Sequence, residues 1–167
     1  AMAELEQYAR GLRYSDEALQ RFITELEASD EKTIVVFYGD HLPALRPSFS
    51  SGVRPKHETP FFVYANYGHR RAEHLPTTSP IHFMNHVLET AGAPVPPYYA
   101  LLGRLEQDVP AMSDALMIGP DNRPVAEGDL TPAVRRLLHD YRLVQYDLSV
   151  GERYSEAALF DPGSPGP

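Results

Sequence analysis

The feature that most constrains the fold is an apolar run at residues 33–38 that shows no polar alternation. β-branched and aromatic residues dominate this run, and they favour strands because their side chains pack well on a pleated surface. A strand that is apolar on both sides is typical of the interior of a sheet covered on both faces. A second run of this kind spans residues 61–65, directly after Pro60. The two runs predict two buried strands.

Helical patterns surround these strands. Apolar residues recur at three- and four-residue steps in residues 4–28, where Gly11 is a candidate break, and again in residues 132–150. Ser79 and Pro80 are typical of a helix start, and Gly92 is typical of the end of the same helix. The order of helix, strand, loop, strand and helix predicts an α/β fold whose parallel strands are joined by crossovers.

Composition limits what these elements can belong to. The 167 residues, 43% of them hydrophobic, are enough for one globular domain with a core. The net charge of −8 argues against a nucleic-acid partner, which would need clustered Lys and Arg. The absence of cysteine excludes disulfides and Cys-ligated zinc. No apolar stretch approaches the roughly 20 residues that cross a bilayer, so we expect a soluble chain. Residues 1–3 are interpreted as an expression remnant and residues 161–167 as a flexible tail.

Asp40 and His41 follow the first predicted strand and are the main candidate site residues. Open α/β sheets place their ligands at the carboxyl ends of strands, and a carboxylate oxygen beside an imidazole nitrogen suits a divalent cation. The alternative is a turn in which Asp40 caps a backbone amide and His41 is only a polar loop residue. A catalytic ion needs about four to six ligands, so the pair would be part of a site.

Three further histidines are candidate site residues. His57 lies between the two predicted strands and is a candidate substrate-binding residue if it turns toward a bound anion, although an exposed loop histidine is the commoner case. His82 and His86 are four residues apart, the spacing of paired zinc ligands on a helix. The remaining residues of a metalloprotease motif are absent, which favours a surface or half-buried pair. Nucleophile-elbow, Walker and dinucleotide-binding motifs are absent as well.

Several blocks together resemble the lipoteichoic acid synthase family of phosphoglycerol transferases, within the sulfatase and alkaline phosphatase superfamily. The most specific block is Tyr38-Gly39-Asp40-His41-Leu42-Pro43. The other blocks are residues 14–19, 22–26, 33–37, 59–64, 144–148 and 151–154. The resemblance implies a partial alkaline-phosphatase/sulfatase-like sheet flanked by helices, in which residues 4–160 form the carboxy-terminal part of a catalytic domain.

The resemblance also implies a chemistry. Asp40 and His41 match two metal ligands of the family, and the metal is commonly manganese, with zinc, magnesium and calcium as alternatives. In the family a threonine attacks phosphatidylglycerol, forms a glycerophospho-threonine and passes glycerol phosphate to a glycan or polymer acceptor. The parent protein would be anchored in the cytoplasmic membrane, with this part outside the cytoplasm.

The match is incomplete at the nucleophile. In the family the threonine and an acidic ligand precede the helix with which this chain begins, and neither Thr33 nor Thr59 lies in the expected strand-to-helix turn. We therefore expect no catalytic nucleophile in this chain and no activity of this chain alone. A sulfatase or phosphodiesterase remains an alternative, and so does a non-catalytic binding or assembly module. Self-association through an exposed sheet edge is a further expectation.

Overall fold

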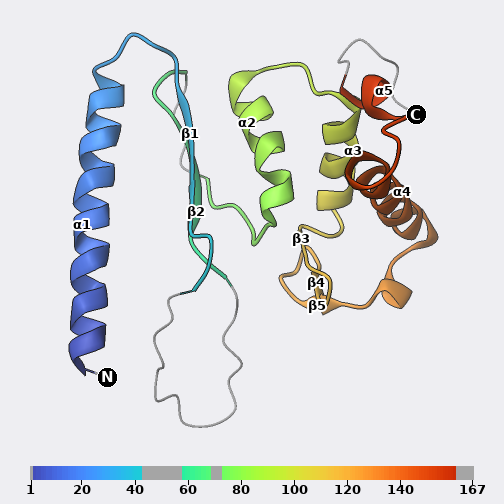
Figure 1. Ribbon diagram of the computed structural model, residues 1–167, viewed down its shortest axis with the longest axis horizontal. Coiled ribbons are helices and arrows are strands. Elements are labelled where there is room, and N and C mark those ends of the chain that lie inside the picture. The colour runs from blue at the N-terminus through green and yellow to red at the C-terminus, as the bar shows by residue number, and fades with distance from the viewer. Residues whose placement is uncertain (1, 43–57, 69–72, 161–167) are drawn as a thin grey trace. The chain divides into compact units, whose positions relative to one another are not determined.

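The computed structural model describes residues 2–42, 58–68 and 73–160. It divides into two compact units, residues 1–70 and 71–167, which are described separately. The first unit contains helix α1 (Met2–Glu27) and strands β1 (Ile34–Tyr38) and β2 (Phe61–Ala65) (Figure 1). The helix is continuous through Gly11, so the predicted break is wrong: a single glycine costs only about 1 kcal/mol in a helix.

Strands β1 and β2 form a two-stranded antiparallel sheet, in which Val36 faces Val63 and Phe37 faces Phe62. The prediction of parallel strands joined by a crossover is therefore wrong for this pair. The rings of Phe37 and Phe62 stack at 5.2 Å between centroids, with planes 16° apart. Such cross-strand pairs stabilise a sheet and help to fix its register.

No described residue of the first unit is buried, although its strands are strongly apolar. The prediction of strands covered on both faces is thus wrong for the described residues, and Phe37 keeps 40% of its surface exposed. The apolar side chains of α1 are similarly open: Leu5 is 52% exposed and Phe22 46%. Polar links and the strand ladder join the elements of this unit.

Asn66 provides the clearest of these polar links. Its side-chain oxygen accepts from the backbone N–H of Thr33 at 2.8 Å, and its side-chain nitrogen donates to the carbonyls of Leu26 and Glu31, both at 2.8 Å. One amide therefore joins the end of α1, the start of β1 and the residue that follows β2. Because the donor and acceptor sides are both used, the orientation of this amide is determined.

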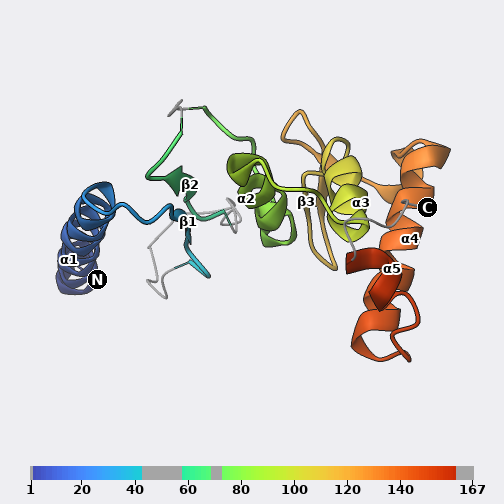
Figure 2. The same cartoon turned by 90° about the horizontal axis from the view of Figure 1, so that it is seen from above.

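The second unit contains the core. Its elements are η1 (Pro80–His82), α2 (Phe83–Ala91), α3 (Pro97–Glu106), β3 (Ala111–Met112), β4 (Met117–Ile118), β5 (Pro124–Val125), η2 (Glu127–Asp129), α4 (Pro132–Ser149) and α5 (Glu156–Phe160). Helix α3 lies between α2 and α4 in both views (Figures 1 and 2) and contacts α5 as well. The core is a cluster of buried aliphatic residues from α3, α4 and the segments beside them: Leu105, Val109, Leu130, Val134 and Leu138.

Local signals account for these elements well. Pro80 begins η1, and Gly92 ends α2 with a left-handed φ of 62°, which glycine adopts without a steric cost. Thr131 caps α4 by accepting from the backbone N–H of Val134. The alternation of helices with small sheets confirms the α/β class. Strands β3, β4 and β5 are antiparallel, like the first pair.

Candidate functional site

The end of β1 carries the predicted pair. Asp40 and His41 follow Gly39, whose N–H donates to the carbonyl of Pro60 at 3.2 Å and so extends the strand ladder by one residue. The carboxylate oxygen Oδ1 of Asp40 lies 3.6 Å from Nε2 of His41, and both side chains are about four-fifths exposed, at 81% and 77%. The turn thus brings two potential ligand atoms within 3.6 Å of each other.

The second ring nitrogen of His41, Nδ1, makes a contact with the backbone. Nδ1 lies 2.9 Å from the carbonyl oxygen of Leu42. A carbonyl oxygen only accepts, so Nδ1 is the donor in this contact, and Nε2 is the ring nitrogen that faces Asp40. Metal-binding histidines are usually held in this way, with the second ring nitrogen donating to a carbonyl or carboxylate.

The separation of the two atoms can be compared with that of real ligands. Metal–oxygen and metal–nitrogen bonds of about 2.1 Å place neighbouring ligands roughly 3.0 Å apart in an octahedron and roughly 3.4 Å apart in a tetrahedron. The observed 3.6 Å is within a small side-chain movement of either value. Asp40 and His41 therefore fit two adjacent positions around a divalent cation.

The pair is not a complete metal site. Within residues 2–42, 58–68 and 73–160, no group of three or more His, Cys, Asp or Glu side chains is arranged to hold an ion. His57, the candidate substrate-binding residue, lies outside the described residues. The assignment of Asp40 and His41 as metal ligands stays a prediction.

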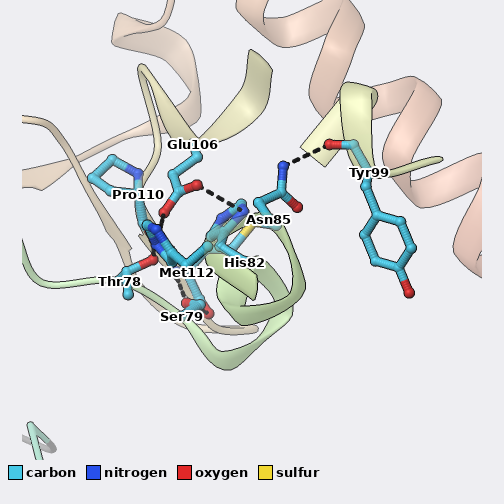
Figure 3. Close-up of polar contacts among 9 residues, drawn as sticks. Thr78, Ser79, His82, Asn85, Tyr99, Glu106, Pro110 and Met112 are labelled. Carbon is cyan, nitrogen blue, oxygen red and sulfur yellow. Dashed lines mark hydrogen bonds and ion pairs between the residues drawn. The ribbon is translucent and has the colours of Figure 1, made fainter. Parts of the chain in front are cut away.

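A second polar cluster lies in the other unit, beside α2 and α3 (Figure 3). Oε1 of Glu106 is 3.1 Å from Nε2 of His86 and accepts from the Thr78 hydroxyl at 2.9 Å. Nδ1 of His82 lies 3.9 Å from Oε2 of the same carboxylate. Hence one carboxylate faces two histidines and a threonine.

His82 is fully buried, with 0% of its surface exposed. The expectation of a surface or half-buried pair thus holds for His86 but is wrong for His82, because His82 lies in the turn of η1 that packs against α3. Neither ring nitrogen of His82 makes a hydrogen bond of normal geometry with a protein atom of the described chain. Burial lowers the pKa of His82, although Glu106 and the backbone of Val109 oppose that shift. Burial therefore disfavours the charged form of this ring.

Charge in the cluster is concentrated on His86 and Glu106. The hydrogen bond from Glu106 raises the pKa of His86 despite the opposing effect of burial. Burial alone would raise the pKa of Glu106, but His86, His82 and Thr78 together hold it below its usual value. Sequence reasoning missed Glu106 because it is 20 residues from His86 along the chain, and only the pairing of α2 with α3 brings the two together.

An open hollow of about 860 Å³ also lies in the second unit, lined in part by β4, β5 and α4. Arg142 on its wall is paired with Glu127 through two hydrogen bonds of 3.0 and 2.9 Å. Its other charged wall residues are Asp114 and Asp129. This acidic lining does not favour a phosphate-bearing ligand, so we place no reactive site there.

Comparisons with known proteins agree with the sequence blocks. A family model described as Sulfatase matches residues 2–93. The chain is also 29% identical over 172 residues to a protein of Rhizobium meliloti (strain 1021) called "Putative cyclic beta-1,2-glucan modification protein". That alignment covers 93% of this chain and 27% of the relative, so the chain spans about a quarter of that protein's length. The comparison with solved structures found no significant match.

Proposed function

The chain belongs to the sulfatase family, and from this premise we propose that it forms the carboxy-terminal part of a catalytic domain that transfers glycerol phosphate to a cell-envelope glycan. The family match supports a partial sulfatase-like α/β fold. The name of the relative refers to modification of a cyclic glucan, which supports a glycan as the acceptor. The block around Asp40 and His41 favours a phosphatidylglycerol-type lipid as the donor.

The observation that carries the proposal is the convergence of Asp40 Oδ1 and His41 Nε2 at 3.6 Å, with Nδ1 of the histidine ring in contact with the Leu42 carbonyl. Sulfatase-family members generally depend on a divalent metal. We assign these two residues as part of its binding site, with manganese as the expected ion. Such an ion supplies positive charge that lowers the pKa of a hydroxyl nucleophile and offsets the charge of phosphoryl oxygens.

The residues of this chain have limited tasks in that scheme. Asp40 contributes the carboxylate oxygen Oδ1, and His41 contributes the imidazole nitrogen Nε2. The nucleophile and the remaining ligands are assigned to parts of the protein outside this chain. Within the described residues, no helix has the length and apolar character that a bilayer crossing requires.

Manganese binding tests the assignment. We expect Mn²⁺ to broaden the nuclear magnetic resonance signal of the His41 ring at lower concentration than the signals of the other histidines, because the paramagnetic ion sits beside that ring. Asp40→Asn should raise the Mn²⁺ concentration needed by at least about tenfold, the lower bound known for loss of an outer-shell partner. His41→Ala identifies the signal by its disappearance.

Two exposed residues provide matched controls. His74→Ala and Asp30→Asn remove the same kinds of side chain from exposed positions and should leave broadening of the His41 signal unchanged. Equal Mn²⁺ sensitivity of the wild type and Asp40→Asn would contradict the metal assignment and leave the pair as a surface turn.

Because the nucleophile and the remaining ligands are assigned to other parts of the protein, we also expect this chain to be inactive by itself. The chain alone, supplied with Mn²⁺ and a fluorescent phosphatidylglycerol analogue, should release no diacylglycerol above the rate without protein. The reason is that two ligands without a nucleophile hold neither the ion nor the phosphodiester in a reactive arrangement. Metal-dependent turnover that is lost in Asp40→Asn would show instead that this chain contains a nucleophile.

A further inference from the structure

Thr59 closes the end of the β1–β2 pair through its side chain. Its hydroxyl donates to the carbonyl oxygen of Gly39 at 2.6 Å, across 20 residues of sequence. The N–H of the same glycine donates to the carbonyl of Pro60 at 3.2 Å. Both polar groups of Gly39, directly before Asp40, are thus bound by the two residues that precede β2.

The close approach explains why residue 39 is a glycine. A Cβ atom built on Gly39 would lie 2.9 Å from Cβ and 3.3 Å from Cγ2 of Thr59, and the first distance is shorter than real contacts allow. Gly39 does not have a positive φ, unlike Gly68 and Gly92. Its requirement for glycine therefore comes from the contact with Thr59 and not from its backbone conformation.

The contact acts on the metal-binding pair through one peptide group. The carbonyl of Gly39 belongs to the same planar unit as the N–H of Asp40, so a hydrogen bond on that oxygen fixes the plane from which the Asp40 side chain leaves the backbone. Asp40 and His41 are largely exposed and have little side-chain packing to hold them. The backbone anchor is consequently the main constraint on their convergence.

We propose that Thr59 is a positioning residue that holds Asp40 and His41 in the arrangement a divalent cation requires. This inference rests on the metal assignment made above and adds to it a residue that does not touch the ion. Loss of an outer-shell partner typically weakens metal affinity by about 10–100-fold, and the same range applies to the hydroxyl of Thr59.

Variants of Thr59 separate positioning from general stability. Thr59→Val keeps the shape and loses the hydroxyl, whereas Thr59→Ser keeps the hydroxyl. We expect the valine variant to need at least about tenfold more Mn²⁺ to broaden the His41 signal, and the serine variant to stay within about twofold of the wild type. Gly39→Ala should behave like valine, because the added methyl group displaces Thr59.

The integrity of the hairpin is measured in the same samples. The stacked rings of Phe37 and Phe62 shift each other's proton resonances, and these shifts report on the β1–β2 pair. If the valine variant loses them, Thr59→Ala removes the hydroxyl with less crowding and carries the same expectation. Wild-type Mn²⁺ affinity in a hydroxyl-free variant that retains the shifts would overturn the proposal. The proposal would also be overturned if every hydroxyl-free variant lost these ring shifts. Thr59 would then stabilise the whole β1–β2 hairpin and not specifically the arrangement of Asp40 and His41.

The outcome for Asp40→Asn distinguishes the two levels of inference. If Asp40→Asn weakens Mn²⁺ binding and Thr59→Val does not, the metal assignment stands and the role of Thr59 is wrong. If neither variant changes Mn²⁺ binding, the metal assignment itself fails, and the role of Thr59 fails with it.

Discussion

Replacement of Leu105 by alanine is expected to lower the free energy of unfolding of the second unit by about 2–5 kcal/mol. Leu105 has 0% of its surface exposed and lies in the aliphatic cluster that joins α3 to α4. Alanine removes three buried carbon atoms and leaves a cavity that the helices fill only in part. Because small domains are stable by about 5–15 kcal/mol, this single change removes a large share of the total.

Chemical denaturation followed by far-ultraviolet circular dichroism measures the loss, since the chain contains no tryptophan to report by fluorescence. Leu143→Ala is the matched control: it makes the same chemical change on α4 at a side chain that is 55% exposed, and should shift stability by less than about 0.5 kcal/mol. Equal shifts for the two variants would contradict the location of the core.

The second large effect concerns Glu106. We expect Glu106→Gln to lower stability by about 1–3 kcal/mol in mildly acidic solution, because a charge-assisted hydrogen bond to His86 is replaced by a neutral one. His86 and Glu106 retain only 17% and 18% side-chain exposure, so solvent screens this pair weakly. The loss of stability in Glu106→Gln should therefore vary with pH.

The direction follows from the pKa shifts. The pKa of His86 is raised above its ordinary 6.5, so its contribution is complete below that pH and is lost as the pH rises through the folded value. The pKa of Glu106 is lowered from 4.5, so its contribution is present above that pH and is lost as the pH falls through the folded value. The difference between wild type and Glu106→Gln should therefore be greatest between these limits.

Neighbouring groups modify this profile without reversing it. Glu89 raises the pKa of His86 further. The lowered pKa of His82 affects stability in the opposite direction, because protonating this buried ring below pH 6.5 destabilises the fold in both proteins.

Denaturation midpoints of the wild type and Glu106→Gln, measured between these pH limits and beyond them, test the prediction. Glu127→Gln breaks an exposed pair with Arg142 and is the control, with a small and nearly pH-independent effect. A constant difference for Glu106→Gln would contradict the ion pair with His86.

Local chemistry made much of the fold predictable. Proline in the first turn of η1, the left-handed Gly92 and the hydroxyl of Thr131 act through their own backbone neighbours, so the sequence around them contains the cause. The same applies to Asp40 and His41, which are adjacent in the chain. A turn after the strand lets the two side chains approach each other, but the contact of Thr59 with Gly39 comes from 20 residues away in the sequence.

Pairing across long loops was not predictable in this way. Residues 33–38 and 61–65 are separated by enough chain for either strand orientation, and the antiparallel register depends on partners such as Phe37 and Phe62. Likewise, Ser79 has the residue type of a helix cap, yet its hydroxyl binds the backbone N–H and carbonyl of Met112 at 2.7 and 3.1 Å. The hydrogen bonds with Met112, which is distant in the sequence, therefore take the place of helix capping.

The junction at Asn66 has a consequence for the chemical ageing of this protein. Hydrolysis of the side-chain amide would put an aspartate carboxylate opposite the carbonyls of Leu26 and Glu31, where the amide now donates two hydrogen bonds. Acceptors would then face acceptors, and the end of α1 would lose its link to the residue after β2. Deamidation at this one position would thus loosen three segments at once, and one of them is the strand that leads to Asp40.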